Sequence, residues 1–185
     1  MEAFLVSLGV VAVAEIGDKT QLLALVLAAR YRRPAPIILG ILSATLVNHF
    51  AAGLLGAWLT SLISPRAMRW ILGLSFLGMA LWTLVPDSLD SKPTEAPPRL
   101  GVYGATAVAF FLLEMGDKTQ IATVALTAKY HSVPLVVAGT TVGMLLADVP
   151  AVLLGEVAAT KLPMRLMQRI AAGVFLVLGV LVLWH

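Results

Sequence analysis

Two copies of one polar motif lie inside otherwise apolar segments of this 185-residue chain. The first copy is residues 15–21, EIGDKTQ, and the second is residues 114–120, EMGDKTQ. A charged side chain near the centre of a bilayer costs about 2.5–3.5 kcal/mol on insertion scales, so two acids and a base in one apolar run are improbable unless they pair or bind something. We interpret the two copies together as a functional site.

The donor groups of the motif suit a hard divalent cation. They are carboxylate, amide and hydroxyl oxygens, which Ca²⁺, Mg²⁺ and Mn²⁺ prefer, and the chain has no cysteine to supply a thiolate for copper. The acids and lysines of the two copies sum to two negative charges, which one divalent cation would neutralise. The predicted metal ligands are Glu15, Asp18, Gln21, Glu114, Asp117 and Gln120.

We expect each copy to lie on a transmembrane helix. Residues three apart share a helical face, so Glu15, Asp18 and Gln21 would line one face, while Gly17 would give either close helix approach or a local break. At 1.5 Å per residue, Glu15 lies roughly 18 Å along the helix from Ala3, near the centre of a hydrocarbon core about 30 Å thick. The faces of the two copies can therefore meet near the midplane.

Other polar residues in the apolar runs are predicted to support the site. Asp148 is expected in or near it, whereas Asn48 is better explained by a helix–helix hydrogen bond than by metal ligation. His49 is the only imidazole at this depth and would favour Mn²⁺ if it faced the site. The supporting residues are Lys19, Thr20, Lys118, Thr119, Asn48 and Asp148.

A purely structural interpretation of the motif competes with metal binding. Glu15 and Lys19 are four residues apart, as are Glu114 and Lys118, so each pair could form a bridge along one helix. That arrangement would leave both motif aspartates unpaired in a low-dielectric setting, which is costly. The lysines are better interpreted as internal counter-ions that hold the acids ionised when the metal has left.

The composition indicates an integral membrane protein. Hydrophobic residues make up 59% of the chain and charged residues only 12%, against roughly a quarter charged in soluble domains. A membrane-spanning helix needs about 20 apolar residues. The apolar runs give six predicted spans, near residues 3–29, 36–63, 68–85, 100–128, 134–159 and 164–184. We therefore predict an all-α integral membrane protein with six transmembrane helices and no separate soluble domain.

The chain repeats itself at a shift of 99 residues, which we call the repeat shift. It pairs Glu15 with Glu114, and Gly40 with Gly139. Three spans per unit is an odd number, so the second unit enters the membrane in the opposite direction, an arrangement characteristic of secondary transporters. The expected domains are a first three-helix repeat, a hydrophilic linker and a second, inverted three-helix repeat, at residues 1–86, 87–99 and 100–185.

Several other classes of function fit less well. The small excess of 13 basic over 10 acidic residues does not indicate nucleic-acid binding, because the bases lie at the ends of apolar runs. An intramembrane hydrolase, and enzyme activity in general, is not expected, because the paired aspartates sit beside lysines and no Ser/His dyad lies at matching depth. No cofactor is expected. A channel or a structural membrane protein remains an alternative to ion/proton exchange.

The doubled Glu-x-Gly-Asp-(Lys/Arg)-(Thr/Ser) motif, one copy per three-span half, resembles the transmembrane protein 165 family of cation/proton exchangers. The resemblance covers essentially the whole chain, and neither copy departs from the pattern. It implies exchange of Mn²⁺ or Ca²⁺ for protons, and small bacterial-type members resemble manganese exporters. We thus expect Mn²⁺ export across a plasma (inner) membrane, with a Ca²⁺/H⁺ antiporter or a divalent cation channel or uniporter as the alternatives. The expected partners are the divalent ion, protons and the lipid bilayer; a homodimer stays open.

Lysine and arginine in the loops predict the orientation. The side that bears the linker holds eight of them, Arg30, Arg32, Arg33, Lys92, Arg99, Lys161, Arg165 and Arg169. The other side holds three, Arg66, Arg69 and Lys129. The positive-inside rule therefore places the linker in the cytoplasm and both termini outside.

This orientation can be measured by cysteine labelling, since the chain has no cysteine of its own. With an impermeant thiol reagent, His185→Cys should be labelled in intact cells, whereas Lys92→Cys should be labelled only in everted vesicles. Labelling of position 185 from the cytoplasmic side would contradict the assignment.

Overall fold

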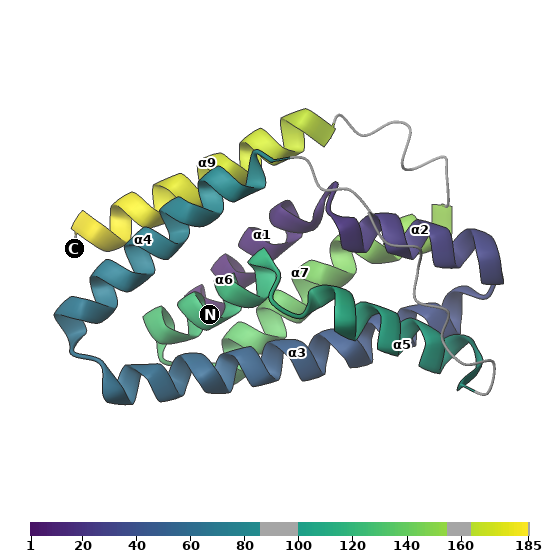
Figure 1. Ribbon diagram of the computed structural model, residues 1–185, viewed down its shortest axis with the longest axis horizontal. Coiled ribbons are helices and arrows are strands. Elements are labelled where there is room, and N and C mark those ends of the chain that lie inside the picture. The colour runs from purple at the N-terminus through teal and green to yellow at the C-terminus, as the bar shows by residue number, and fades with distance from the viewer. Residues whose placement is uncertain (86–99, 155–163, 185) are drawn as a thin grey trace.

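The computed structural model describes residues 1–85, 100–154 and 164–184, and every regular element within these ranges is a helix. These helices are α1 (Glu2–Glu15), α2 (Lys19–Tyr31), α3 (Pro34–Leu62), α4 (Pro65–Thr83), α5 (Gly101–Glu114), α6 (Lys118–Tyr130), α7 (Val133–Leu154) and α9 (Met164–Trp184). The predicted all-α class is confirmed for the described residues (Figure 1). The predicted linker at residues 87–99, Lys161 and His185 lie outside them.

The first and fourth predicted spans are each two helices rather than one. α1 ends and α2 begins around Gly17, which has a φ of 85°, and α5 and α6 meet around Gly116, which has a φ of 79°. Side chains with a Cβ rarely adopt this left-handed backbone region, so glycine permits the break. The expectation that Glu15, Asp18 and Gln21 line one continuous helical face is therefore wrong, and the local break considered for Gly17 is confirmed.

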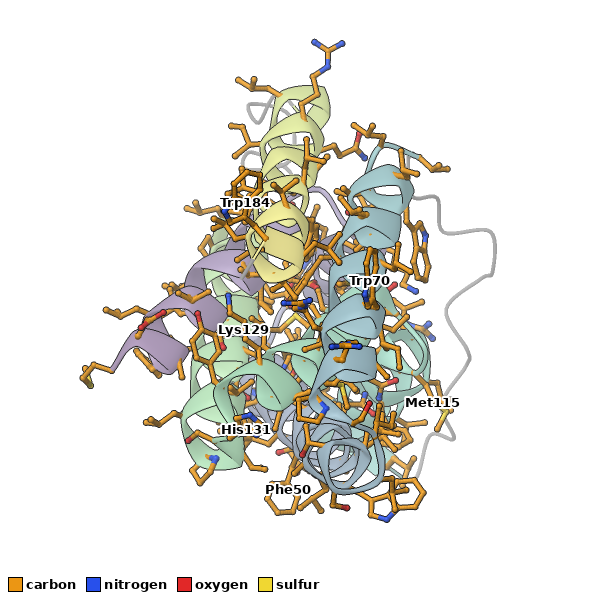
Figure 2. The ribbon with its side chains drawn as sticks, turned by 90° about the vertical axis from the view of Figure 1, so that its left-hand side faces the viewer. Phe50, Trp70, Met115, Lys129, His131 and Trp184 are labelled. Atoms are coloured by element: carbon orange, nitrogen blue, oxygen red, sulfur yellow. The ribbon has the colours of Figure 1, made fainter. Side chains whose placement is uncertain are left out.

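The second, third and sixth predicted spans each correspond to one helix, as do the described residues of the fifth. α3 and α4 begin at Pro34 and Pro65, where proline suits a first helical turn because its missing N–H has no partner to lose. α3 and α7 are long and apolar enough to cross a membrane. Large apolar side chains also face outward, including Phe50, Trp70 and Trp184, which are 52%, 53% and 84% exposed (Figure 2). Such an exterior fits a lipid environment better than water.

The long helices of one half pack on the short helices of the other. α7 lies along α1, and α3 lies along α5 (Figure 1). A Cβ added at Gly40 of α3 would lie 2.9 Å from the carbonyl oxygen of Tyr103, and one added at Gly139 of α7 would meet that of Phe4. The two contacts are related by the repeat shift, so both halves use the same packing, and only glycine allows it.

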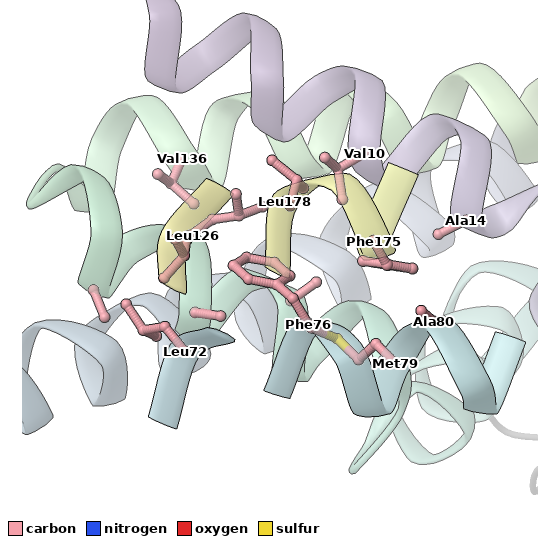
Figure 3. Close-up of a cluster of buried hydrophobic side chains, with 14 of the residues drawn as sticks. Val10, Ala14, Leu72, Phe76, Met79, Ala80, Leu126, Val136, Phe175 and Leu178 are labelled. Atoms are coloured by element: carbon pink, nitrogen blue, oxygen red, sulfur yellow. The ribbon is translucent and has the colours of Figure 1, made fainter. Parts of the chain in front are cut away.

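α4 and α9 form a second layer that covers α1 and α6. Their contact includes the stacked rings of Phe76 and Phe175, whose centroids are 6.4 Å apart at an interplanar angle of 26° (Figure 3). These two residues are also related by the repeat shift. The contact between α4 and α9 is apolar. The polar motif residues lie instead at the breaks between α1 and α2 and between α5 and α6.

Candidate metal site

The two helix breaks bring acids from both halves of the chain together. One carboxylate oxygen each of Glu15, Glu114 and Asp117 lies within 4.8 Å of the others. The three residues are 0%, 0% and 2% exposed. Ligands on opposite sides of a six-coordinate cation, with bonds of about 2.0–2.6 Å, are roughly 4.0–5.2 Å apart. The cluster therefore has the dimensions of a divalent cation site.

The motif acids divide into two kinds according to their place on the helices. Asp18 and Asp117 are the N-terminal caps of α2 and α6, where the positive end of the helix macrodipole stabilises a negative charge. Glu15 and Glu114 are the last residues of α1 and α5, where the negative end of the macrodipole disfavours one. The two glutamates consequently need a cation or a proton more than the two aspartates do.

The motif lysines pair with the aspartates of the opposite copy. Lys19 Nζ lies 2.8 Å from Asp117 Oδ1, and Lys118 Nζ pairs with Asp18 Oδ1. The ion pairs differ from the alternative bridges along one helix, which would join Glu15 to Lys19 and Glu114 to Lys118. In each copy the helix is broken between the glutamate and the lysine. Two crossed ion pairs therefore tie the halves together, and among the described residues neither glutamate forms an ion pair with a lysine or an arginine.

The two motif glutamines hold the breaks. The Gly17 N–H donates to Gln21 Oε1 at 2.9 Å, and the Gly116 N–H donates to Gln120 Oε1 at 2.8 Å. Gln21 Nε2 also donates to the carbonyl oxygen of Ala147 on α7, at 3.0 Å. The amide oxygens thus satisfy backbone donors that the helix break would otherwise leave unpaired. Metal ligation by these two residues stays a prediction.

The motif threonines are buried beside the acids. Thr20 Oγ1 donates to Glu15 Oε2 at 2.5 Å and lies 3.4 Å from Asp18 Oδ2. Thr20 and Thr119 are both 0% exposed. The Thr20 hydroxyl holds one carboxylate oxygen of Glu15. The other oxygen, Oε1, has no hydrogen-bond partner among the described residues.

α3 and α7 contribute the remaining polar residues. The predicted helix–helix hydrogen bond of Asn48 is present, with Nδ2 donating to the carbonyl oxygen of Phe111 at 3.1 Å. His49 is 0% exposed, and its Nε2 lies 3.7 Å from Glu114 Oε2. Asp148 is also 0% exposed, and neither of its carboxylate oxygens has a hydrogen-bond partner among the described residues.

His49 was not among the residues predicted to form the site, although a signal for it exists in the sequence. The repeat shift pairs His49 with Asp148, which is predicted in or near the site. Because α3 and α7 are equivalent helices, the position of His49 indicates that it also lies near the site.

Buried oxygens without a hydrogen-bond partner mark the site. Within the part of the chain that the structure describes, the carboxylate oxygens of this kind include Glu15 Oε1, Asp117 Oδ2, and both oxygens of Glu114 and of Asp148. Buried polar groups are nearly always paired, and an unpaired buried charge is expensive. Oxygen donors in this number fit the binding of a hard divalent cation.

Comparison with known proteins finds relatives along nearly the whole chain. Residues 3–91 and 102–185 match the family described as divalent cation/proton antiporter GDT1. A protein of Vibrio cholerae serotype O1, named as a candidate manganese exporter, is 49% identical over 180 residues, covering 97% of this chain and 89% of that protein. GDT1-like protein 5 of Arabidopsis thaliana is 27% identical over 217 residues, covering 97% and 94%. No solved structure gives a significant match.

The crossed ion pair predicts a specific energetic coupling. In a double-mutant cycle, Lys19→Met and Asp117→Asn should be non-additive by about 0.5–3 kcal/mol, because removing the lysine leaves the buried Asp117 unpaired and removing the carboxylate leaves a partly buried Lys19 unpaired. The measurement is thermal unfolding of the detergent-solubilised protein. The matched cycle of Lys19→Met with Glu15→Gln should show clearly weaker coupling, and stronger coupling there would favour the bridge along one helix instead.

Proposed function

Because this chain belongs to the GDT1, or transmembrane protein 165, family of divalent cation/proton antiporters, we propose that it exports Mn²⁺ from the cytoplasm in exchange for protons. Family membership confirms the resemblance inferred from the doubled motif, and the family is one of membrane transporters rather than enzymes. The choice of Mn²⁺ is supported by the relative named as a candidate manganese exporter. The single observation that carries the proposal is the buried cluster of Glu15, Glu114 and Asp117.

The ion is proposed to bind between the two helix breaks. Glu15, Glu114 and Asp117 would supply carboxylate oxygens, and Asp18, Gln21 and Gln120 complete the predicted ligand set. Support comes from the charge balance. Lys19 and Lys118 offset the two motif aspartates, so the two glutamates remain as the charge that one divalent cation neutralises.

Protons are proposed to replace the metal at the same acids. Once the ion leaves, several carboxylates remain together in a low-dielectric interior, and their repulsion favours proton uptake. Asp148 adds a further buried acid on α7 without a hydrogen-bond partner among the described residues. The crossed lysines would limit how many protons are needed, because two of the charges are already balanced.

The transport cycle is proposed to rest on two inverted three-helix repeats at residues 1–86 and 100–185, joined by a cytoplasmic linker. The swapped contacts of α7 with α1 and of α3 with α5 support this arrangement. Rocking of one repeat against the other would expose the shared site to each side in turn, as in other transporters built from inverted repeats. Loading from the cytoplasm and return with protons would then give export driven by the proton gradient.

Ca²⁺/H⁺ exchange is the second candidate. It is favoured by the cluster itself, because carboxylate oxygens alone suit Ca²⁺ as well as Mn²⁺.

The exchange mechanism can be tested in proteoliposomes that contain the purified protein. An imposed pH gradient should drive Mn²⁺ flux, metal movement should be accompanied by opposite proton movement, and apparent Mn²⁺ affinity should fall as the pH is lowered, because protons and metal compete for the same carboxylates. Flux that is unchanged when the pH gradient is collapsed would contradict exchange and favour a channel or uniporter.

The site can be tested by isosteric substitution. Glu15→Gln and Asp117→Asn should each abolish Mn²⁺ flux while the protein remains folded, because each removes a charged donor and keeps the shape of the side chain. Glu2→Gln is the matched control, since Glu2 is an exposed glutamate on the same helix as Glu15. Equal losses in Glu2→Gln and Glu15→Gln would mean that the cluster is not the transport site.

A further inference from the structure

We infer that His49 is a metal ligand and that its imidazole makes the site select Mn²⁺ over Ca²⁺ and Mg²⁺. This inference rests on the proposed transport function and specifies it further. The carboxylates explain why a divalent cation binds, but they do not by themselves distinguish between hard cations of similar charge. A nitrogen donor in the same shell would make that distinction.

The surroundings of His49 are difficult to explain by packing alone. The side chain is 0% exposed, and neither ring nitrogen has a hydrogen-bond partner among the described residues. A neutral imidazole carries one N–H donor and one acceptor nitrogen, and buried groups of this kind are normally paired. Its Nε2 instead faces Glu114 Oε2, which is itself buried and without a hydrogen bond.

The distance between the two atoms fits joint ligation of one ion. At 3.7 Å, His49 Nε2 and Glu114 Oε2 are too far apart for a hydrogen bond. Two ligands with bonds of about 2.1 Å lie roughly 3.0 Å apart at a right angle and about 4.2 Å apart on opposite sides of an ion. The observed separation lies between these limits. Glu114 is also a member of the three-acid cluster, so the imidazole lies beside one of the proposed ligands of Mn²⁺.

A hydrogen bond next to His49 ties its helix to the end of α5. Asn48, one residue earlier on α3, donates to the carbonyl oxygen of Phe111, three residues before Glu114 on α5. This bond fixes the register of α3 against the end of α5. The repeat shift also places His49 and Asp148 at equivalent positions. One repeat therefore presents a nitrogen where the other presents a carboxylate, and the duplicated site is chemically asymmetric at this position.

The chemistry of the donor gives a graded signature. Oxygen ligands suit Mg²⁺, Ca²⁺ and Mn²⁺, whereas imidazole binds first-row transition metals with affinity rising from Mn²⁺ to Co²⁺. Replacing the imidazole with an amide should therefore reduce the handling of Co²⁺ most, that of Mn²⁺ less, and that of Ca²⁺ least. A structural role, such as an ion pair between His49 and Glu114, would affect the three cations equally.

The test compares His49→Gln with His131→Gln, a matched substitution at the exposed end of α6. In proteoliposomes, the ratio of Mn²⁺ to Ca²⁺ flux should fall about tenfold or more in His49→Gln, within the range seen when groups that support metal binding are removed. The loss for Co²⁺ should exceed that for Mn²⁺, and His131→Gln should keep the ratios of the unaltered protein. An unchanged ratio, or equal losses for all three cations, would overturn the inference while leaving Mn²⁺/H⁺ exchange intact.

A second readout does not depend on transport. Electron spin echo measurements on Mn²⁺ bound to the purified, unaltered protein should show modulation from a directly coordinated nitrogen, which should disappear in His49→Gln. Absence of nitrogen modulation in the unaltered protein would overturn the inference whatever the flux. Failure of the unaltered protein to move Mn²⁺ under a pH gradient would instead reject the proposed function, while nitrogen modulation would still establish His49 as a ligand.

Discussion

Negative charge buried in an apolar interior is the constraint on which the rest of this structure depends. Glu15, Glu114 and Asp148 are 0% exposed, and an unpaired charge in such a place costs several kcal/mol. The chain meets this constraint partly with its own groups: two lysines and two helix N-termini stabilise the motif aspartates. It leaves the glutamates at helix C-termini, where only a cation or a proton can balance them. Structure and proposed transport thus follow from the same electrostatic imbalance.

The helix break makes this division of labour possible. In a continuous helix, Glu15 and Lys19 would face each other four residues apart and neutralise one another locally. Gly17 and Gly116 instead turn the chain, so that each lysine reaches the aspartate of the opposite copy. The glutamines satisfy the backbone donors that the turn exposes. Within the motif, the glycine and the glutamine therefore form the helix break, and the lysine and the aspartate form the ion pairs between the halves.

Two nearly identical motifs do not have identical surroundings. Lys19 has 22% of its side chain exposed and Lys118 only 3%, while Gly17 is buried and Gly116 is exposed. The helices that cover them differ as well, with His49 on α3 and Asp148 on α7 at the equivalent position. A transporter built from two repeats needs such inequality in any one conformation, because a fully symmetric arrangement would open the site to both sides or to neither.

The sequence by itself determined the helical class, the duplication and the two clusters of acids, because apolar run length, periodicity and charges inside apolar runs are local properties of the chain. It also indicated that Asp148 belonged near the site and that Asn48 would bond to another helix. Only the tertiary structure decided that the lysines pair across the repeats, that the glutamines hold the breaks, and that His49 faces Glu114. The ion pairs and the contact of His49 join residues that are up to about a hundred positions apart in the chain. The role of the glutamines depends on whether Gly17 continues the helix or breaks it. Their geometry is set by the close packing of α3 on α5 and of α7 on α1, which no local pattern specifies.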